Sequence, residues 1–444
     1  MPDAHQKPRP ARNWKLALRA LEHRNFRLYF GGQGLSVIGT WMTRTAIAWL
    51  VYKLTGSAIL LGVVAFAGQL PTFLLAPFAG VWVDRLPRRP LLVVTQALAM
   101  AESLALAVLA FTHITIIEII ALSAFQGFIN AFDMPGRQSF LVDMVEGHEA
   151  LGNAIALNSS MVNLARLIGP AVAGLIIALW GESWCFLIDG ISYIAVLASL
   201  VAMANLPQRM AQARRSMLMS LREGWSFVSG FAPARNLLLL VALVSLVGIP
   251  YTVLMPLFAG NVLHGGAHTL GFLLGAAGAG ALLGAVRLAA RPSVRGLTKV
   301  VPISAGLFGF GLLTFGLSHW LWLSLPLIFV AGLGMMQQMA STNTILQTVV
   351  DDEKRGRVMA FYTMAFVGMA PWGSLLSGWM ANRMGAPHTL VLNGAVCMGS
   401  AAWFATQLKT VRNAIRPVYQ RLGIIPEMTT GIQSAAALTT PPQE

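Results

Sequence analysis

A cluster of charged residues separates two long apolar stretches in the segment LAPFAGVWVDRLPRRPLLVVTQ, which runs from Leu75 to Gln96. The cluster contains one acid and three arginines, at Asp84, Arg85, Arg88 and Arg89. A carboxylate and a guanidinium at this spacing can form an ion pair, and such a pair is stronger beside a low-dielectric medium than in water. The chemistry of the cluster therefore depends on whether the flanking stretches cross a membrane.

The composition is that of a membrane protein. Of 444 residues, 56% are hydrophobic and only 11% are charged, whereas soluble chains average about 45–50% apolar and about 25% charged residues. The formal net charge of +14 would suit a nucleic-acid partner only if the basic residues gathered on a folded polar domain. The sequence contains no such domain, so we expect a membrane protein with no nucleic-acid partner.

Twelve apolar stretches are long enough to cross a bilayer as helices, which takes about 20 residues each. Their apolar runs are continuous rather than alternating, which predicts helices and excludes barrel strands. The predicted fold class is an all-α membrane protein with twelve transmembrane helices. We expect the spans at 28–52, 58–83, 91–111, 115–135, 154–179, 184–205, 237–260, 269–290, 300–317, 321–343, 358–380 and 389–408.

Lysine and arginine are concentrated on one predicted side of the membrane. All but four of the 31 such residues lie in segments that share one side when the chain crosses an even number of times. Because basic loops stay in the cytoplasm, we expect both termini to be cytoplasmic and the basic face to contact anionic lipid. The first 25 residues are basic and contain proline, with no apolar core before a cleavage site, so no cleaved signal peptide is expected.

The two halves of the sequence repeat with a constant offset of 204 residues. This offset carries Gly169 and Gly174 onto Gly373 and Gly378, which predicts two six-helix bundles. We expect a basic cytoplasmic tail at 1–27, an N-terminal bundle at 28–205, a cytoplasmic linker at 206–235, a C-terminal bundle at 236–410 and a partly disordered cytoplasmic tail at 411–444.

The twelve spans, the duplication and the segment GVWVDRLPRRP after span two resemble the major facilitator superfamily. The loop of that superfamily reads roughly G-x-x-x-D-R-x-G-R-R/K, and here it is matched at Gly80, Asp84, Arg85, Arg88 and Arg89, with Pro87 in place of glycine. The segments FDMPGRQSFLVDMV, NAIALNSSMVNLARLIGPAVAG and RGRVMAFY resemble the bacterial group that includes the enterobactin exporter and the transmembrane secretion effectors. The resemblance covers about residues 20–410 and implies alternating access, in which two bundles rock about a central site.

The resemblance implies a role for the charged loop. In the superfamily, an acid and an arginine of this loop form a cytoplasmic latch with an acid at the end of span four, and the latch holds the outward-facing state. In this chain we expect the latch to comprise Asp84, Arg85, Arg88 and Asp133. The alternative is that the arginines only mark the cytoplasmic side, and no special role is expected of Arg89.

Charged residues inside spans are costly, at about 2.5–3.5 kcal/mol each on insertion scales, so each one is a functional candidate. Arg44 and Glu118 lie in the outer third of spans one and four, which line the cavity in the superfamily, and we expect them to pair. Glu102 in span three is a candidate proton carrier or half of a static pair with Arg166. Asp189 in span six is expected to be peripheral. The alternatives are structural ion pairs and interfacial acids.

Uncharged polar residues gather on spans one, four and ten, which line the cavity in the superfamily. In span one they recur at spacings of three and four residues, which places them on one helical face. Hydrogen bonding between helices is the alternative explanation. We expect the substrate surface to include Gln33, Gln126, Asn130 and Gln337.

Gly169, Pro170 and Gly174 resemble a degenerate form of the G-P-x-x-G-G motif that exporters carry in span five. Small residues let helices approach closely, and a proline permits a bend; packing alone is the alternative role.

The sequence has no nucleotide-binding loop of the form G-x-x-x-x-G-K-[ST] and no catalytic constellation. Its two cysteines, Cys185 and Cys397, have no metal-binding spacing, so we expect no cofactor, no metal and no enzymatic activity.

These features predict a secondary transporter in the bacterial inner membrane that exports a hydrophobic or amphipathic small molecule, such as a drug or siderophore, against protons. The expected partners are that substrate, protons and lipid, and the chain is expected to be a monomer. An importer is the main alternative, because a fold does not set the direction of transport. A membrane-embedded enzyme or sensor is a third possibility.

Overall fold

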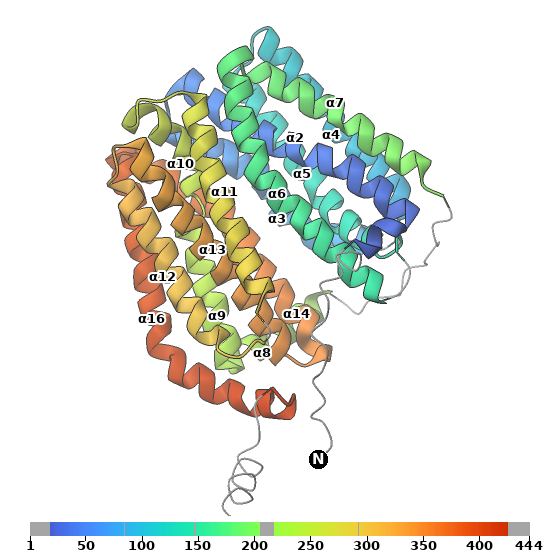
Figure 1. The fold of residues 1–444 in the computed structure, drawn as a ribbon, viewed down its shortest axis with the longest axis vertical. Coiled ribbons are helices and arrows are strands. Elements are labelled where there is room, and N and C mark those ends of the chain that lie inside the picture. Colours follow the sequence, from blue (N-terminus) through green and yellow to red (C-terminus); the bar gives the residue numbers. More distant parts are fainter. Residues whose placement is uncertain (1–17, 84, 146–147, 205–216, 292, 425–444) are drawn as a thin grey trace, which may run out of the picture. The chain divides into compact units, whose positions relative to one another are not determined.

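The computed structural model of the protein describes residues 18–83, 85–145, 148–204, 217–291 and 293–424. Within these ranges every regular element is a helix, as Figure 1 shows. The predicted all-α fold class is confirmed.

The helices follow one another with short connections. The first seven elements are η1 (Arg19–Glu22), α2 (Arg24–Thr55), α3 (Ala58–Val83), α4 (Arg88–Phe111), α5 (Ile116–Leu141), α6 (His148–Trp180) and α7 (Glu182–Ala202). The next are α8 (Met217–Gly230), α9 (Ala232–Leu243), η2 (Val244–Gly248), α10 (Tyr251–Leu257), η3 (Phe258–Val262) and α11 (Ala267–Ala289). The last are α12 (Leu297–Gly316), α13 (Leu321–Val349), α14 (Asp352–Thr363), η4 (Met364–Gly368), α15 (Ala370–Met384) and α16 (Ala386–Arg421).

Eleven of the described helical runs are long and apolar enough to cross a membrane, and they correspond to the second through twelfth predicted spans. Two of these runs are composite: Ala232–Val262 joins α9 to η3, and Glu353–Met384 joins α14 to α15. The first predicted span lies in α2, whose 32 residues exceed the length that a crossing requires. The last helix, α16, continues to Arg421, beyond the predicted start of the C-terminal tail at residue 411.

The chain forms two compact units. Among the described residues, unit 1 takes those up to Ile47 and from Leu70 to the end of α7, whereas unit 2 takes Ala48–Gln69 and everything from α8 onward. The α2–α3 turn therefore packs with unit 2, although the predicted N-terminal bundle at 28–205 included it.

A close helix crossing holds the α2–α3 turn in unit 2. A methyl group added at Gly62 would lie 2.7 Å from the carbonyl oxygen of Ser374, and the rings of Phe66 and Trp372 lie 5.3 Å apart. Such small-residue crossings are the usual way in which membrane helices approach each other.

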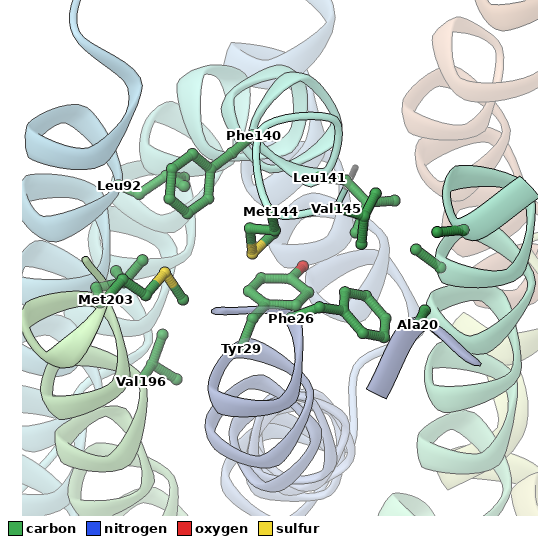
Figure 2. Close-up of a cluster of buried hydrophobic side chains, with 13 residues drawn as sticks. Ala20, Phe26, Tyr29, Leu92, Phe140, Leu141, Met144, Val145, Val196 and Met203 are labelled. Atoms are coloured by element: carbon green, nitrogen blue, oxygen red, sulfur yellow. The ribbon is translucent and has the colours of Figure 1, made fainter. Parts of the chain in front are cut away.

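One end of unit 1 contains a buried apolar cluster that joins η1 to α2, α4, α5, α6 and α7. Figure 2 shows Tyr29 beside Met144 and Phe26, with Phe140 against Leu92. The cluster also contains Ala20, Leu141, Val145, Ala150, Ala154, Val196, Leu200 and Met203. It fixes the beginning of α4 against the end of α5, where the charged residues of the candidate site lie.

The packing of the two units repeats with the offset found in the sequence. A methyl group at Gly169 of α6 would lie 2.5 Å from Trp41 Cβ and 3.4 Å from the backbone nitrogen of Met42. A methyl group at Gly373 would overlap the carbonyl oxygen of Leu246, and Leu246 is the residue that the offset of 204 pairs with Met42. The two glycines therefore allow equivalent helix crossings in the two units.

The linker helix α8 is attached to α14 within unit 2. Arg357 donates to the Glu223 carboxylate at 2.6 Å, and the Lys354 ammonium lies 5.0 Å from the centre of the Phe227 ring. These contacts tie the side of the linker next to α9 to the beginning of the eleventh span.

Candidate functional site

A small polar cavity lies inside unit 1, between α2, α4, α5 and α7. Its volume of about 20 Å³ is room for about one water molecule. It is lined by Gln33, Ser36, Thr40, Gln96, Ala99, Gln126, Ile129, Asn130, Asp133, Arg137 and Tyr193. Three of the four residues predicted for the substrate surface are therefore neighbours in the structure, namely Gln33, Gln126 and Asn130.

An ion pair on α5 forms the charged wall of this cavity. Arg137 pairs with Asp133 one helical turn away, and the Asp133 side chain is almost fully buried. Asp133 Oδ1 also accepts hydrogen bonds from Thr95 Oγ1 at 3.0 Å and Gln96 Nε2 at 2.7 Å, both on α4. These three donors compensate the negative charge of the buried carboxylate. Removal of any one of them would leave a charge or a dipole without its partner in an apolar interior.

The expected pairing of Arg88 with Asp133 is wrong in this structure. The guanidinium of Arg88 pairs instead with Asp143 at 2.6 Å and also donates to the carbonyl oxygen of Ser139 at 3.1 Å. The expectation assumed that span four ends near residue 135, whereas α5 continues through Pro135 to Leu141. Asp133 thus lies eight residues inside the helix, or about 12 Å from its end at 1.5 Å per residue.

The other members of the predicted latch are placed as follows. Asp84 lies outside the described residues, and Arg85 is exposed. Arg89, of which no special role was expected, donates to the Val201 carbonyl oxygen at 2.7 Å. Arg89 therefore ties the beginning of α4 to α7.

The sequence had led us to expect that Glu118 pairs with Arg44, but the structure shows a different role for Glu118. Its carboxylate accepts hydrogen bonds from the backbone nitrogen of Thr115 at 2.7 Å and from Thr115 Oγ1 at 2.9 Å. Together with the bond from the Glu118 backbone nitrogen to Thr115 Oγ1, this is a capping box at the start of α5. A threonine followed three residues later by glutamate is the sequence signature of that cap, so the correct role was readable from the sequence.

Arg44 instead shares an aromatic ring with Arg166. The Cζ atoms of both guanidinium groups lie 5.1 Å from the centre of the Trp41 ring. Trp41 and Arg166 are half-buried, whereas Arg44 is exposed. A cation–π contact contributes about 0.5–2 kcal/mol, which is less than the cost of about 2.5–3.5 kcal/mol for placing a single charge at membrane depth.

Two buried acids lie close to each other on α4 and α7. Glu102 and Asp189 are 3% and 1% exposed, and their charges interact. Asp189 Oδ2 accepts hydrogen bonds from Thr43 Oγ1 and Ser103 Oγ, both at 2.8 Å. One oxygen of each acid, Glu102 Oε1 and Asp189 Oδ1, has no hydrogen-bond partner among the described residues.

Asp189 therefore lies in the interior of unit 1. Its position in the sequence had suggested a peripheral location, and this expectation was wrong. A methyl group at Gly39 of α2 would lie 2.5 Å from Asp189 Oδ1, so a glycine is what admits this carboxylate to the helix interface. Gly39 and Thr43 are spaced by one helical turn in span one, and this pairing of a small residue with a hydroxyl was the available signal.

Gln337, the fourth residue predicted for the substrate surface, lies in unit 2. Its Oε1 accepts a hydrogen bond from Ser304 Oγ at 3.3 Å, across α12 and α13. A methyl group at Gly284 of α11 would lie 3.3 Å from Gln337 Cγ. Gln337 thus links three helices of unit 2.

The exporter-like motif of span five has a clear structural role at its first position. Gly169 is where α6 crosses α2 at Trp41, and Pro170 lies inside α6 without ending it. Gly174 is buried. The motif therefore sets how Trp41, and with it the two arginines, is held.

The fold and the site together define a multi-pass membrane transporter, and comparison with known proteins identifies its family. The model of the family described as transmembrane secretion effectors matches residues 16–420. The chain belongs to this family of the major facilitator superfamily.

Relatives of similar length support this assignment. The staphyloferrin A transporter of Staphylococcus aureus is 28% identical over 385 residues, which cover 85% of this chain and 95% of that protein. The macrolide efflux protein A of Streptococcus pyogenes is 24% identical, with 86% of this chain and 94% of that protein covered. The multidrug efflux pump Tap of Mycolicibacterium fortuitum is 26% identical, with 85% and 95% covered.

Solved structures agree on the fold. A D-xylose–proton symporter matches with a TM-score of 0.65 at 15% identity, over 88% of this chain and 97% of that one. A bacterial homologue of the human lysosomal transporter Spinster, in an inward-facing and unoccupied conformation, matches with a TM-score of 0.64 at 13% identity, over 91% and 98%. At these identities the likeness concerns the fold alone.

Proposed function

We propose that the protein is a proton-coupled exporter of a hydrophobic or amphipathic small molecule, acting by alternating access in the bacterial inner membrane. The names of two relatives, a macrolide efflux protein and a multidrug efflux pump, support export. The absence of a nucleotide-binding loop from the sequence supports an ion gradient as the source of energy. We also propose that both termini are cytoplasmic, which the distribution of lysine and arginine supports.

The observation that carries the coupling part of the proposal is the pair of buried acids, Glu102 and Asp189. A carboxyl group in an apolar interior, beside a second acid, is suited to bind and release a proton. Glu102 is the better candidate for the carrier, because Asp189 already accepts hydrogen bonds from two hydroxyl groups. Glu118, which caps α5, is no longer a candidate.

The cavity residues contribute polar groups to the transport pathway in this proposal. Gln33, Gln126 and Asn130 surround the ion pair of Asp133 and Arg137. The cavity itself is far below the volume of about 300–1,000 Å³ that a drug-sized ligand occupies. It therefore serves as a polar wall next to the pathway rather than as a complete substrate pocket, and Gln337 of unit 2 is the proposed polar contribution of the other half.

The latch is retained in a revised form. Arg88 and Asp143 are the pair that we propose for the conformational contact at the beginning of α4, and Arg85 stays in the proposal as a residue of the same loop. Asp84 stays in the proposal on the resemblance of its loop to the superfamily motif alone.

The test is transport in inverted membrane vesicles. Vesicles from cells that produce the protein should accumulate a radiolabelled macrolide or siderophore from a panel when respiration supplies a proton gradient. A protonophore should abolish this uptake, and vesicles without the protein should show none. Accumulation only in right-side-out vesicles would establish the alternative, an importer.

A further inference from the structure

We propose that the last turns of α16, residues 406–421, bind the headgroups of anionic phospholipids at the membrane surface. We call these residues the terminal segment of α16. The inference goes beyond the proposed export, and it does not depend on the direction of transport or on the source of energy.

The length of α16 places the terminal segment at the edge of the membrane. The helix has 36 residues, whereas a crossing takes about 20, so a crossing that starts at Ala386 ends near residue 405. Trp403, close to that end, is an exposed side chain, and tryptophan is enriched where the membrane meets water. The terminal segment therefore begins at the depth of the lipid headgroups.

The terminal segment is held against the protein. Its side chains at Val411, Ile415 and Tyr419 are spaced by four residues and are buried, so one face of the helix is covered within the protein. Figure 1 shows that the last turns of α16 leave the direction of the rest of the helix. A helix end that turns aside and is packed in this way stays near the membrane surface.

The exposed side of the terminal segment carries positive charge without compensation. Lys409, Arg412 and Arg416 are exposed, and their spacings of three and four residues place them on neighbouring turns of one side. Among the residues that the structure describes, no carboxylate pairs with any of the three. All of α16, moreover, contains neither aspartate nor glutamate.

The chemistry of these groups selects an anionic phospholipid. A guanidinium group binds a phosphate through two parallel hydrogen bonds, and each lysine or arginine near an anionic membrane surface strengthens binding by about fivefold. Phosphatidylglycerol keeps the full negative charge of its phosphate. Phosphatidylcholine has the same phosphate beside a quaternary ammonium group, which cancels that charge, so the terminal segment should prefer phosphatidylglycerol.

A fluorophore on the terminal segment tests the proposal in detergent-purified, full-length protein. Asn413 is exposed, and the two native cysteines are buried, so Asn413→Cys takes up a maleimide fluorophore selectively. The labelled protein is titrated with phosphatidylglycerol or phosphatidylcholine that carries a nitroxide near its headgroup, which quenches the fluorophore only at close range. Phosphatidylglycerol should quench at a concentration at least about tenfold lower, and added salt should reduce this difference.

Two triple variants, each made in the labelled protein, separate this surface from the general charge of the protein. Lys409→Gln with Arg412→Gln and Arg416→Gln should make the two lipids quench equally. The matched control removes the same charge from three other exposed bases of unit 2, those at residues 287, 291 and 295, and should keep the preference. All six side chains are exposed, so both variants should fold, which circular dichroism and gel filtration check.

The proposal is overturned if neither lipid quenches the fluorophore, if both quench it equally in the labelled protein without further changes, or if the terminal-segment variant keeps the preference. An equal loss in the control variant would also overturn it, since the total charge would then attract the lipid. Displacement of phosphatidylglycerol by inorganic phosphate at constant ionic strength would show a site for small anions instead. Failure of vesicle transport rejects only the exporter function, because the quenching requires no transport.

Discussion

Asp133 and Arg137 pair one turn apart on α5, while α4 presents Thr95 and Gln96 to the same carboxylate. The ion pair is therefore local to one helix, but its full set of hydrogen bonds requires α4 to pack in register. Because the Asp133 carboxylate is buried and the Arg137 side chain is partly buried, Asp133 depends on Arg137 and on the donors of α4 rather than on solvent. The structure thus couples helix packing to charge compensation inside unit 1.

Asp133→Asn should destabilise the protein. It leaves the guanidinium of Arg137, which is 27% exposed, without its counter-charge, so the cost should fall below the about 3–5 kcal/mol that is typical of a fully buried pair. Thermal unfolding in detergent, followed by size-exclusion chromatography, should show a lower melting temperature. The double variant Asp133→Asn with Arg137→Gln should recover much of the stability, and a double variant as unstable as the single one would contradict this explanation.

Arg88 and Asp143 should behave as a functional pair. Asp143→Asn should reduce transport several-fold while leaving most of the protein folded, because a change of 1–3 kcal/mol in a conformational equilibrium is an effect of about 5–150-fold. The exchange of both residues, Arg88→Asp with Asp143→Arg, should restore part of the transport.

Arg89→Gln removes one hydrogen bond to a carbonyl and should cost only about 0.5–1.5 kcal/mol of stability. If all variants lose transport equally, and each loss matches the fall in the amount of protein, the arginines only set the topology.

Glu102→Gln should uncouple transport from the proton gradient. The amide has nearly the shape of the acid but cannot carry the proton, so uphill export should fail while downhill exchange of substrate across the membrane persists. Glu118→Gln is the control, since Glu118 is the third residue of a capping box, where glutamine can make the same hydrogen bond, so coupling should stay intact. Undiminished uphill export by Glu102→Gln would remove this residue as the carrier.

Gly169→Ala should damage the protein far more than Gly152→Ala, although both glycines lie in α6. The added methyl group would lie 2.5 Å from Trp41 Cβ at Gly169, whereas nothing lies within 4 Å of it at Gly152. Alanine is favoured over glycine in a helix by about 0.5–1 kcal/mol, so Gly152→Ala should be neutral or stabilising. The comparison is made by thermal unfolding, and similar melting temperatures for both variants would refute the close crossing.

Reporter fusions should establish the orientation. An alkaline phosphatase fused within residues 206–235 should be inactive, as expected for a cytoplasmic site, and one fused at Gly385 should be active. Gly385 precedes α16 and follows a predicted external end of span eleven. An active fusion in the linker would reverse the assignment of sides made from the basic residues.

The helices were predictable from sequence because their signal is long and repeated. About 20 consecutive apolar residues have few alternative structures in a bilayer, so eleven described runs fall where the stretches predicted them. The end of α5 was the instructive failure. The predicted span stopped at residue 135, whereas α5 continues through Pro135 to Leu141, since membrane helices tolerate proline where neighbouring groups satisfy the freed backbone.

The partners of the charged residues were much less predictable. Spacing along a helix finds local partners, such as Glu118 with Thr115, and could have found Asp133 with Arg137. It cannot find the contact of Arg166 with Trp41, because that contact depends on how closely α6 and α2 approach each other. Glycine at residue 169 determined that distance, and its effect is visible only once the two helices are packed.

Helix α3 passes from unit 2 into unit 1 between Gln69 and Leu70, and the next residue is Pro71. A proline inside a helix removes one backbone hydrogen bond and lowers the resistance to bending at that turn. The shared helix thus bends more easily next to the place where its attachment changes. In mechanical terms, α3 is a beam with a compliant joint at Pro71, where bending needs less force than in an uninterrupted helical turn.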